Sequence, residues 1–312
     1  MTKSKLGAVG LGLVGLGSTL LASPANAALS CGTAPTGGTI TSTNDYCQLT
    51  FSTAGSYNVT IPAAATELYA IVVGSGEGAG VIVDTNGAIA YAGTGGQVKY
   101  LNLTDQIDTP ISVNVGAGGV VSDNYLSPSG TDTTLTYSST GASAYTGNYP
   151  RDIVEQCIVP NYTSGLSNYL LFYGMDGKGR SRVTATGQSC DTANGLGINP
   201  SLGDTDNDGN PVPAIFANYN HYLGAGGAMS IDGTTASNGF GAGGSMSISS
   251  TDGTFSNVSN GKDGAVIFRW KQPAELAATG SDSSMVSVFG GALVTTGVAS
   301  MMVAKTRRRV AR

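Results

Sequence analysis

The chain contains little charge and a single histidine, which narrows the chemistry that it can perform. Charged residues make up 11% of its 312 residues, and the one histidine is His221. No H-E-x-x-H zinc motif and no G-x-S-x-G nucleophile elbow occurs. A Ser-His-Asp site stays open with one histidine, and catalytic carboxylate pairs cannot be located from a sequence. Because no complete catalytic constellation is found, the sequence predicts a non-enzyme, with a hydrolase as the less favoured alternative.

The N-terminal end has the parts of a secretory signal peptide. Lys3 and Lys5 give a positive start, and the uncharged apolar run at 6–22 predicts a signal helix. Ala25 and Ala27 form a small-x-small cleavage site, so we expect cleavage after Ala27. An uncleaved membrane anchor is the alternative, and it is disfavoured because the cleavage site follows the apolar run directly.

The C-terminal end carries three features in order. A pentapeptide comes first, and an uncharged apolar run at 285–304 follows it. As a transmembrane helix, this run would measure about 30 Å, the thickness of a bilayer core. The basic tail at 305–312 is of the kind that the positive-inside rule keeps in the cytoplasm. The pentapeptide consists of Leu276, Ala277, Ala278, Thr279 and Gly280.

This three-part tail resembles the sorting signal of sortase substrates, whose usual pentapeptide is LPxTG. Ala277 stands where that family more often has proline, and the LAxTG form resembles the signal of housekeeping sortases in many high-GC Gram-positive bacteria. The resemblance implies that a sortase attacks the Thr279 carbonyl of a membrane-bound precursor and transfers the chain to a peptidoglycan amine. The implied location is the cell wall, and the alternative is an ordinary single-pass anchor.

Removal of both ends would leave an acidic ectodomain. Seven of the 15 basic residues and one of the 20 acidic residues lie outside residues 28–279, so the net charge would move from −5 to −11. Phosphate binding relies on lysine and arginine, and anionic lipid attracts basic segments. The composition therefore argues against nucleic acid as a partner and against a position on lipid head groups.

The four cysteines all fall between the two end signals. An even number of cysteines in an exported chain predicts two disulfides, and four cysteines allow three pairings. Nearest-neighbour pairing is our prediction because each such pair brackets one local segment. Zinc is disfavoured, since no C-x-x-C spacing occurs. The predicted pairs are Cys31 with Cys47 and Cys157 with Cys190.

The middle of the chain has the pattern of β-structure interrupted by glycine. Apolar residues alternate at 57–61, 97–103 and 111–115, as in half-buried strands. The nearly continuous apolar run at 68–73 predicts a strand that is buried on both faces, and the run at 265–270 predicts a terminal strand. With 47 glycines among them, these strands predict a mainly β fold.

The order of these motifs is similar to glycine-rich β-domains of bacterial surface proteins and phage tail proteins. The similarity rests on 51–62, 71–74, 113–119 and 261–267, and it covers about Gln48–Lys271. It implies a β-scaffold with glycine-rich loops or stacked extended glycine helices, and a role in display and binding rather than catalysis. The expected divisions are a signal peptide (1–27), a disulfide-held leader (28–48), a glycine-rich β domain in two parts (49–147 and 221–272), a disulfide-closed insertion (148–220), a linker with the sorting motif (273–284), a transmembrane segment (285–304) and a cytoplasmic tail (305–312).

One short motif resembles half of a calcium loop. Asp204, Asp206 and Asp208 alternate, and Gly209 follows at the position of the sharp turn. An EF-hand also needs an acid at its twelfth position, where this chain has Ile215, so an EF-hand is excluded. A shorter calcium loop is one hypothesis, and a plain surface turn is the other.

Tyrosines gather in or beside the predicted insertion, where they offer a binding surface or fill the core. Exposed tyrosines suit recognition of sugars or proteins, but tyrosine also favours strands. We predict a structural or adhesive ectodomain, with a surface glycan or protein as ligand. A calcium-stabilised carbohydrate-binding module and a wall-acting hydrolase are the alternatives. These tyrosines are Tyr162, Tyr169, Tyr173, Tyr219 and Tyr222.

Overall fold

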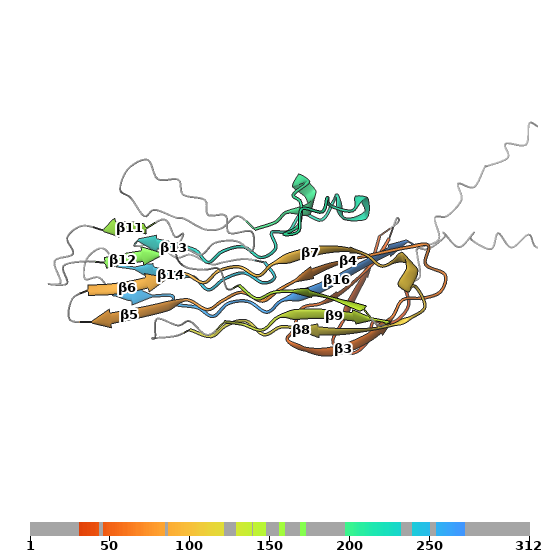
Figure 1. Ribbon diagram of the computed structural model, residues 1–312, viewed down its shortest axis with the longest axis horizontal. Coiled ribbons are helices and arrows are strands. Elements are labelled where there is room, and N and C mark those ends of the chain that lie inside the picture. The colour runs from red at the N-terminus through yellow and green to blue at the C-terminus, as the bar shows by residue number, and fades with distance from the viewer. Residues whose placement is uncertain are drawn as a thin grey trace, which may run out of the picture. The chain divides into compact units, whose positions relative to one another are not determined.

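The computed structural model describes most of the region between the two predicted end signals, and that region is mainly β (Figure 1). Residues Ala28–Ala274 form one compact unit. The signal peptide, the sorting motif, the apolar run and the basic tail lie outside the described residues. Those described are 31–43, 46–84, 87–121, 129–138, 140–147, 156–159, 169–172, 197–231, 239–249 and 254–271.

A five-stranded sheet carries the predicted strands at 68–73 and 265–270 in its interior. Both runs form strands as predicted, and they pair with each other in antiparallel fashion. Their side chains serve two cores, because alternate residues point to opposite faces of a sheet. In order, the strands are β1 (Thr39–Ser42), β2 (Cys47–Phe51), β16 (Ala265–Lys271), β4 (Glu67–Val73) and β7 (Val98–Asn102).

A four-stranded sheet packs on one face of the first sheet. The predicted alternation is confirmed in one of its strands, where Ile111, Val113 and Val115 are buried and the residues between them are exposed. These residues share one core with Phe268 and Trp270 of β16. In order, the strands are β10 (Thr140–Ala144), β9 (Thr133–Tyr137), β8 (Pro110–Val115) and β3 (Gly55–Thr60).

The opposite face of the five-stranded sheet is covered by residues 197–223, which comprise the last part of the predicted insertion (148–220) and the three residues that follow it. Phe216 and Leu223 from this stretch are fully buried against Ile71 and Ile267 of the sheet. The stretch contains short 3-10 turns rather than strands, because prolines and Asx residues interrupt it. The short 3-10 helices among the described residues are η1 (Thr104–Gln106), η3 (Pro200–Leu202) and η4 (Ala214–Phe216).

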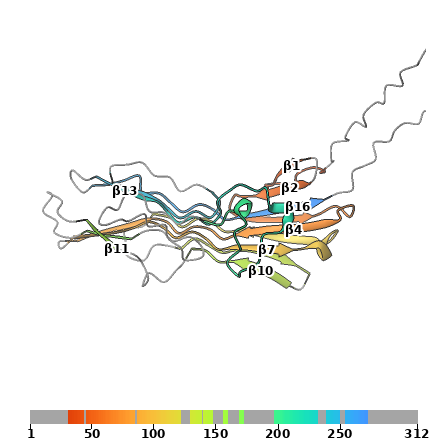
Figure 2. The same cartoon turned by 90° about the horizontal axis from the view of Figure 1, so that it is seen from above.

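Glycine-rich segments continue from these sheets side by side, as Figures 1 and 2 show. Gly74 and Glu77 donate backbone hydrogen bonds to one neighbouring segment, whereas Gly76 and Ala79 donate to another. Donors to one neighbour therefore recur every third residue, the period of an extended polyproline II-type helix rather than of a β-strand. We call these segments the glycine bundle: 74–79, 92–97, 116–121, 129–132, 145–147, 224–228, 239–245 and 259–264.

Glycine is needed in the bundle because backbones lie in direct contact there. A Cβ atom at Gly76 would lie closer than 3.0 Å to the backbone of Ala242. One at Gly93 would lie equally close to the backbone of Glu77. At these glycines no side chain fits between the segments, and backbone hydrogen bonds join them directly.

Short sheets lie at the far end of the glycine bundle (Figure 1). One long hairpin extends from the five-stranded sheet to these short sheets. Its pairing keeps a single register, from Tyr69 opposite Asn102 to Asp84 opposite Gly87. The hydrogen bonds of the glycine segments between these ends keep that register. The strands are β11 (Gln156–Val159), β12 (Tyr169–Phe172), β6 (Gly87–Tyr91) and β5 (Gly80–Asp84) in one sheet, and β13 (Met229–Ile231), β14 (Met246–Ile248) and β15 (Phe255–Ser256) in another.

The first predicted disulfide is present. Cys31 and Cys47 are bonded, with their Cα atoms 5.5 Å apart, and the bond ties the leader to the first residue of β2. Cys157 lies on β11, but Cys190 lies outside the described residues. The second pairing therefore stays a prediction.

Candidate functional site

The aspartate motif at 204–210 folds around one buried carboxylate. Asp206 is fully buried, and its Oδ1 accepts hydrogen bonds from the N–H groups of Asp208 (3.0 Å) and Asn210 (2.7 Å). Its Oδ2 accepts from the Tyr100 N–H group (2.9 Å) and from Asn210 Nδ2 (3.0 Å). Four donors therefore satisfy this carboxylate, which is what a buried ion without a cationic partner requires.

The same loop pairs with the outer edge of β7. The Val98 N–H group donates to Asn207 Oδ1 (2.7 Å), and the Asn207 N–H group donates back to the Val98 carbonyl (3.0 Å). The Tyr100 hydroxyl donates to the Asp204 carbonyl (3.0 Å). Burial raises the pKa of Tyr100, and the charges of Asp204 and Asp206 raise it further. The loop thus takes the place of a further strand and closes an edge that would otherwise be open to pairing.

The other two carboxylates of the motif have separate partners. Asp204 Oδ2 accepts from the Asn199 N–H group (2.9 Å), and Asp208 Oδ2 lies 3.2 Å from Lys99 Nζ. Among the described residues, no group of three or more His, Cys, Asp or Glu side chains is arranged to hold a metal ion. The geometry gives this loop a structural role, and calcium binding stays a prediction for direct titration.

A buried arginine in β16 joins the five-stranded sheet to the 197–223 covering. Arg269 is 3% exposed, and its Nε donates to Gln48 Oε1 (2.8 Å). Its Nη1 donates to the Ile215 carbonyl (2.8 Å) and to Asn218 Oδ1 (2.6 Å). All three acceptors are neutral, and among the residues that the structure describes no carboxylate pairs with this guanidinium.

Aromatic rings supply the electrostatic compensation for this arginine. The guanidinium carbon lies 4.2 Å from the ring centre of Tyr46 and 4.9 Å from those of Phe216 and Tyr219. Ring faces attract cations, and the attraction grows when water is excluded. Burial lowers the pKa of Arg269, and it raises the pKa of Tyr219 to about 12. This group was not predicted from the sequence, although an arginine inside an otherwise apolar strand was the available signal.

Shallow hollows flank this group and the glycine bundle. The first, of about 350 Å³, lies over the arginine cage, and the second, of about 460 Å³, lies beside the bundle. The second hollow includes Ser52 and Lys262, and both Asp263 carboxylate oxygens there accept backbone hydrogen bonds, from the N–H groups of Ala54 (3.0 Å) and Gly118 (2.9 Å). The first is lined by Tyr46, Ala214, Ile215, Ala217, Asn218 and Lys271. The second is lined by Ser52, Gly239, Phe240, Gly261, Lys262 and Asp263.

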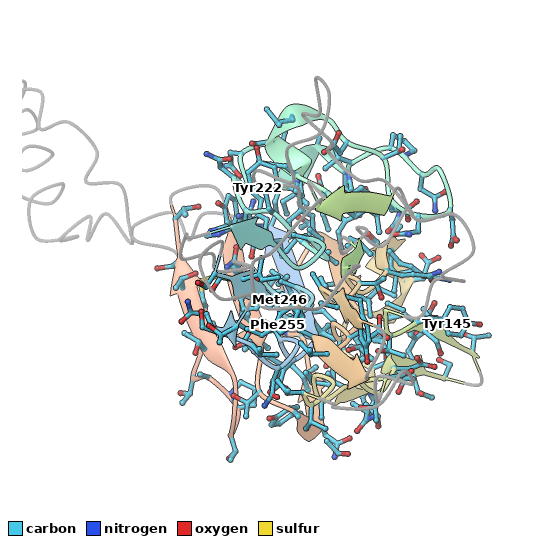
Figure 3. The ribbon with its side chains drawn as sticks, turned by 90° about the vertical axis from the view of Figure 1, so that its left-hand side faces the viewer. Tyr145, Tyr222, Met246 and Phe255 are labelled. Atoms are coloured by element: carbon cyan, nitrogen blue, oxygen red, sulfur yellow. A yellow bond between two sulfur atoms is a disulfide. The ribbon has the colours of Figure 1, made fainter. Side chains whose placement is uncertain are left out.

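The predicted aromatic surface is divided between core and exterior. Tyr219 is buried against Phe216, whereas Tyr222 is 45% exposed. The His221 ring lies 4.7 Å from that of Tyr219, and within the described ranges no carboxylate contacts it. Tyr145 is also exposed, but it lies apart from Tyr222 (Figure 3). The described aromatic residues therefore do not form one continuous platform.

Several predicted site residues lie beyond what the structure describes. They include Ala25 and Ala27 of the cleavage site, residues 276–280 of the sorting motif, Tyr162 and Tyr173. Over the ranges that are described, no helix has both the length and the apolar character needed to span a bilayer.

Comparison with known protein families identifies a domain in this chain. None of the curated proteins matches the chain. The model of one family, a glycine-rich domain, matches residues 51–271. These bounds enclose β3 to β16 and the whole glycine bundle. They nearly coincide with the region that the sequence motifs indicated. The chain therefore belongs to the glycine-rich domain family.

Proposed function

We propose that this protein is exported, joined to peptidoglycan at Thr279 by a sortase, and displayed on the wall of a Gram-positive cell with a structural or adhesive role. One observation carries the proposal: pentapeptide 276–280, apolar run 285–304 and basic tail 305–312 follow one another at the C-terminal end. A pentapeptide alone arises easily by chance. Its position directly before a span of membrane length and a basic stop is far more specific.

The chemistry that follows is acyl transfer. The apolar run would hold the precursor in the membrane while a sortase thiolate attacks the Thr279 carbonyl carbon. The Thr279–Gly280 amide bond breaks, the leaving amine takes a proton, and a thioester remains on the enzyme. An amine of a peptidoglycan precursor then attacks the thioester and regenerates the thiol. The net result exchanges one amide bond for another.

The arrangement of the described domain supports display. Cys47, the first residue of β2, pairs with Trp270 near the end of β16. β2 therefore begins on the side of the domain where β16 ends. The pair of Asp84 with Gly87 lies at the other end of the long hairpin. A domain held through the residues after β16 would present this far end to the surroundings.

Cell fractionation tests the proposal directly. The parent protein should leave the wall only after muramidase digestion, whereas Thr279→Ala should collect in the membrane or the medium. Thr295→Ala is the matched control, because it changes a threonine inside the apolar run and should leave wall attachment intact. If Thr279→Ala stays in the wall fraction like the parent, the sorting motif has no such role.

A further inference from the structure

The last strand, β16, is one part of a longer segment of the chain. β16 pairs with β4 over its whole length, from Ala265 opposite Val73 to Lys271 opposite Glu67. Before β16, residues 259–264 continue directly into the glycine bundle. We call residues 259–271 the terminal segment.

The register of this pairing continues from the sheet into the bundle. The Gly76 N–H group donates to the Lys262 carbonyl (2.9 Å), and the Ala79 N–H group donates to the Ser259 carbonyl (3.2 Å). Each bond joins the residues that an unbroken extension of the β4–β16 ladder would place opposite each other. The terminal segment is therefore matched to residues 67–79 along its full length.

The other side of the terminal segment is bonded as well. β16 pairs with β2 from Val266 to Trp270, and the Gly264 N–H group donates to the Gly116 carbonyl (2.9 Å). Every residue of β16 except Lys271 is buried. Sliding this segment along its axis would break bonds on two sides at once and drag buried side chains through two cores.

We propose that the terminal segment is a shear clamp that lets the domain resist tension between its far end and its C-terminal side. Hydrogen bonds of an antiparallel ladder lie perpendicular to the strands. Tension along the strands therefore loads many bonds together, whereas tension across them opens one bond at a time. The direction of this tension rests on the proposed function, because a wall bond at Thr279 would apply it at the end of β16.

The same molecule contains an opposite geometry as a control. When the N-terminal end is pulled, the Cys31–Cys47 disulfide transmits the force to Cys47, the first residue of β2. That residue pairs with Trp270 near the end of β16. Pulling the two chain ends apart would therefore open the β2–β16 ladder from its end, one pair after another.

Single-molecule force spectroscopy on the full chain distinguishes the two geometries. One handle stays at the C-terminal end, and the second is either a click-reactive residue at position 84 or a tag at the N-terminal end. We expect a rupture force several-fold higher with the handle at position 84. Equal forces in the two geometries would refute the clamp. These forces do not depend on wall attachment, so the clamp and the anchoring proposal fail separately.

Two variants test which side chains hold the clamp. Arg269→Gln removes the guanidinium that joins β16 to residues 197–223. It should lower the rupture force measured with the handle at position 84. Lys271→Gln changes an exposed pair with Glu67 and should leave that force unchanged. If Arg269→Gln fails to fold, the comparison of pulling geometries in the parent still decides the proposal. A drop of the same size in both variants would contradict the role given to Arg269.

Discussion

Replacing Gly76 with alanine probes the close backbone contact in the glycine bundle. The new Cβ atom would lie closer than 3.0 Å to the backbone of Ala242 and Gly243, so the segments must separate. Separation breaks the bond from the Gly76 N–H group to Lys262 (2.9 Å) and the bond from Gly119 to the Gly76 carbonyl (2.8 Å). A buried polar group left unsatisfied costs about 1–3 kcal/mol, so the free energy of unfolding should fall by about 2–5 kcal/mol.

Urea unfolding followed by tryptophan fluorescence measures this change, because Trp270 is the single tryptophan and is 1% exposed. Gly141→Ala on edge strand β10 is the milder comparison, since only the Leu135 carbonyl oxygen, at 2.9 Å, lies within 3.0 Å of the added Cβ atom and the next atom lies at 3.6 Å. Alanine also removes entropy from the unfolded chain, worth about 0.4–1 kcal/mol, so Gly141→Ala should lower the free energy of unfolding much less than Gly76→Ala. If Gly76→Ala stays within about 0.5 kcal/mol of the parent, the bundle does not depend on the contact described.

Two further predictions concern the aspartate loop and the buried tyrosine. Asp206→Ala should lower the free energy of unfolding by about 2–4 kcal/mol in urea melts because four donors lose their acceptor. Asp208→Ala, which removes a pair with Lys99 on the surface, should change it by less than about 1 kcal/mol, and equal losses would contradict this difference. Because burial raises the pKa of Tyr219 from 10.0 to about 12, stability should be retained below pH 10 and lost as the pH rises toward 12. Tyr219→Phe should weaken this alkaline loss in pH-dependent urea melts, and an unchanged pH profile would contradict the assignment.

The strands could be predicted because their signal is local. The apolar run at 68–73 required burial on both faces, and the structure places alternate residues of β4 in two cores. The alternation at 111–115 likewise required one buried and one exposed face, as β8 has. In both cases the period of side-chain hydropathy is the physical cause of the packing.

The neighbours within the glycine bundle could not be predicted, because glycine has no side chain whose pattern would report a partner. A glycine in a loop cannot be distinguished by sequence from a glycine in contact with a distant backbone. Gly76 is an example, because its neighbour Ala242 is 166 positions away in the sequence. The aspartate motif is ambiguous for a different reason. Carboxylates spaced to surround a cation are also spaced to accept backbone N–H groups, as Asp206 does. Only the fold decides between these uses.

The single register of the long hairpin limits how the family can change in length. A residue inserted into 74–79 alone would displace every β5–β6 pair up to that of Asp84 with Gly87. Within the bundle, a residue with a side chain that is shifted to a glycine position would also clash with a neighbouring backbone. Segments of the bundle can therefore lengthen only together and by matched amounts. We expect related chains to keep these segments constant in length and to accumulate insertions and deletions in the turns between them.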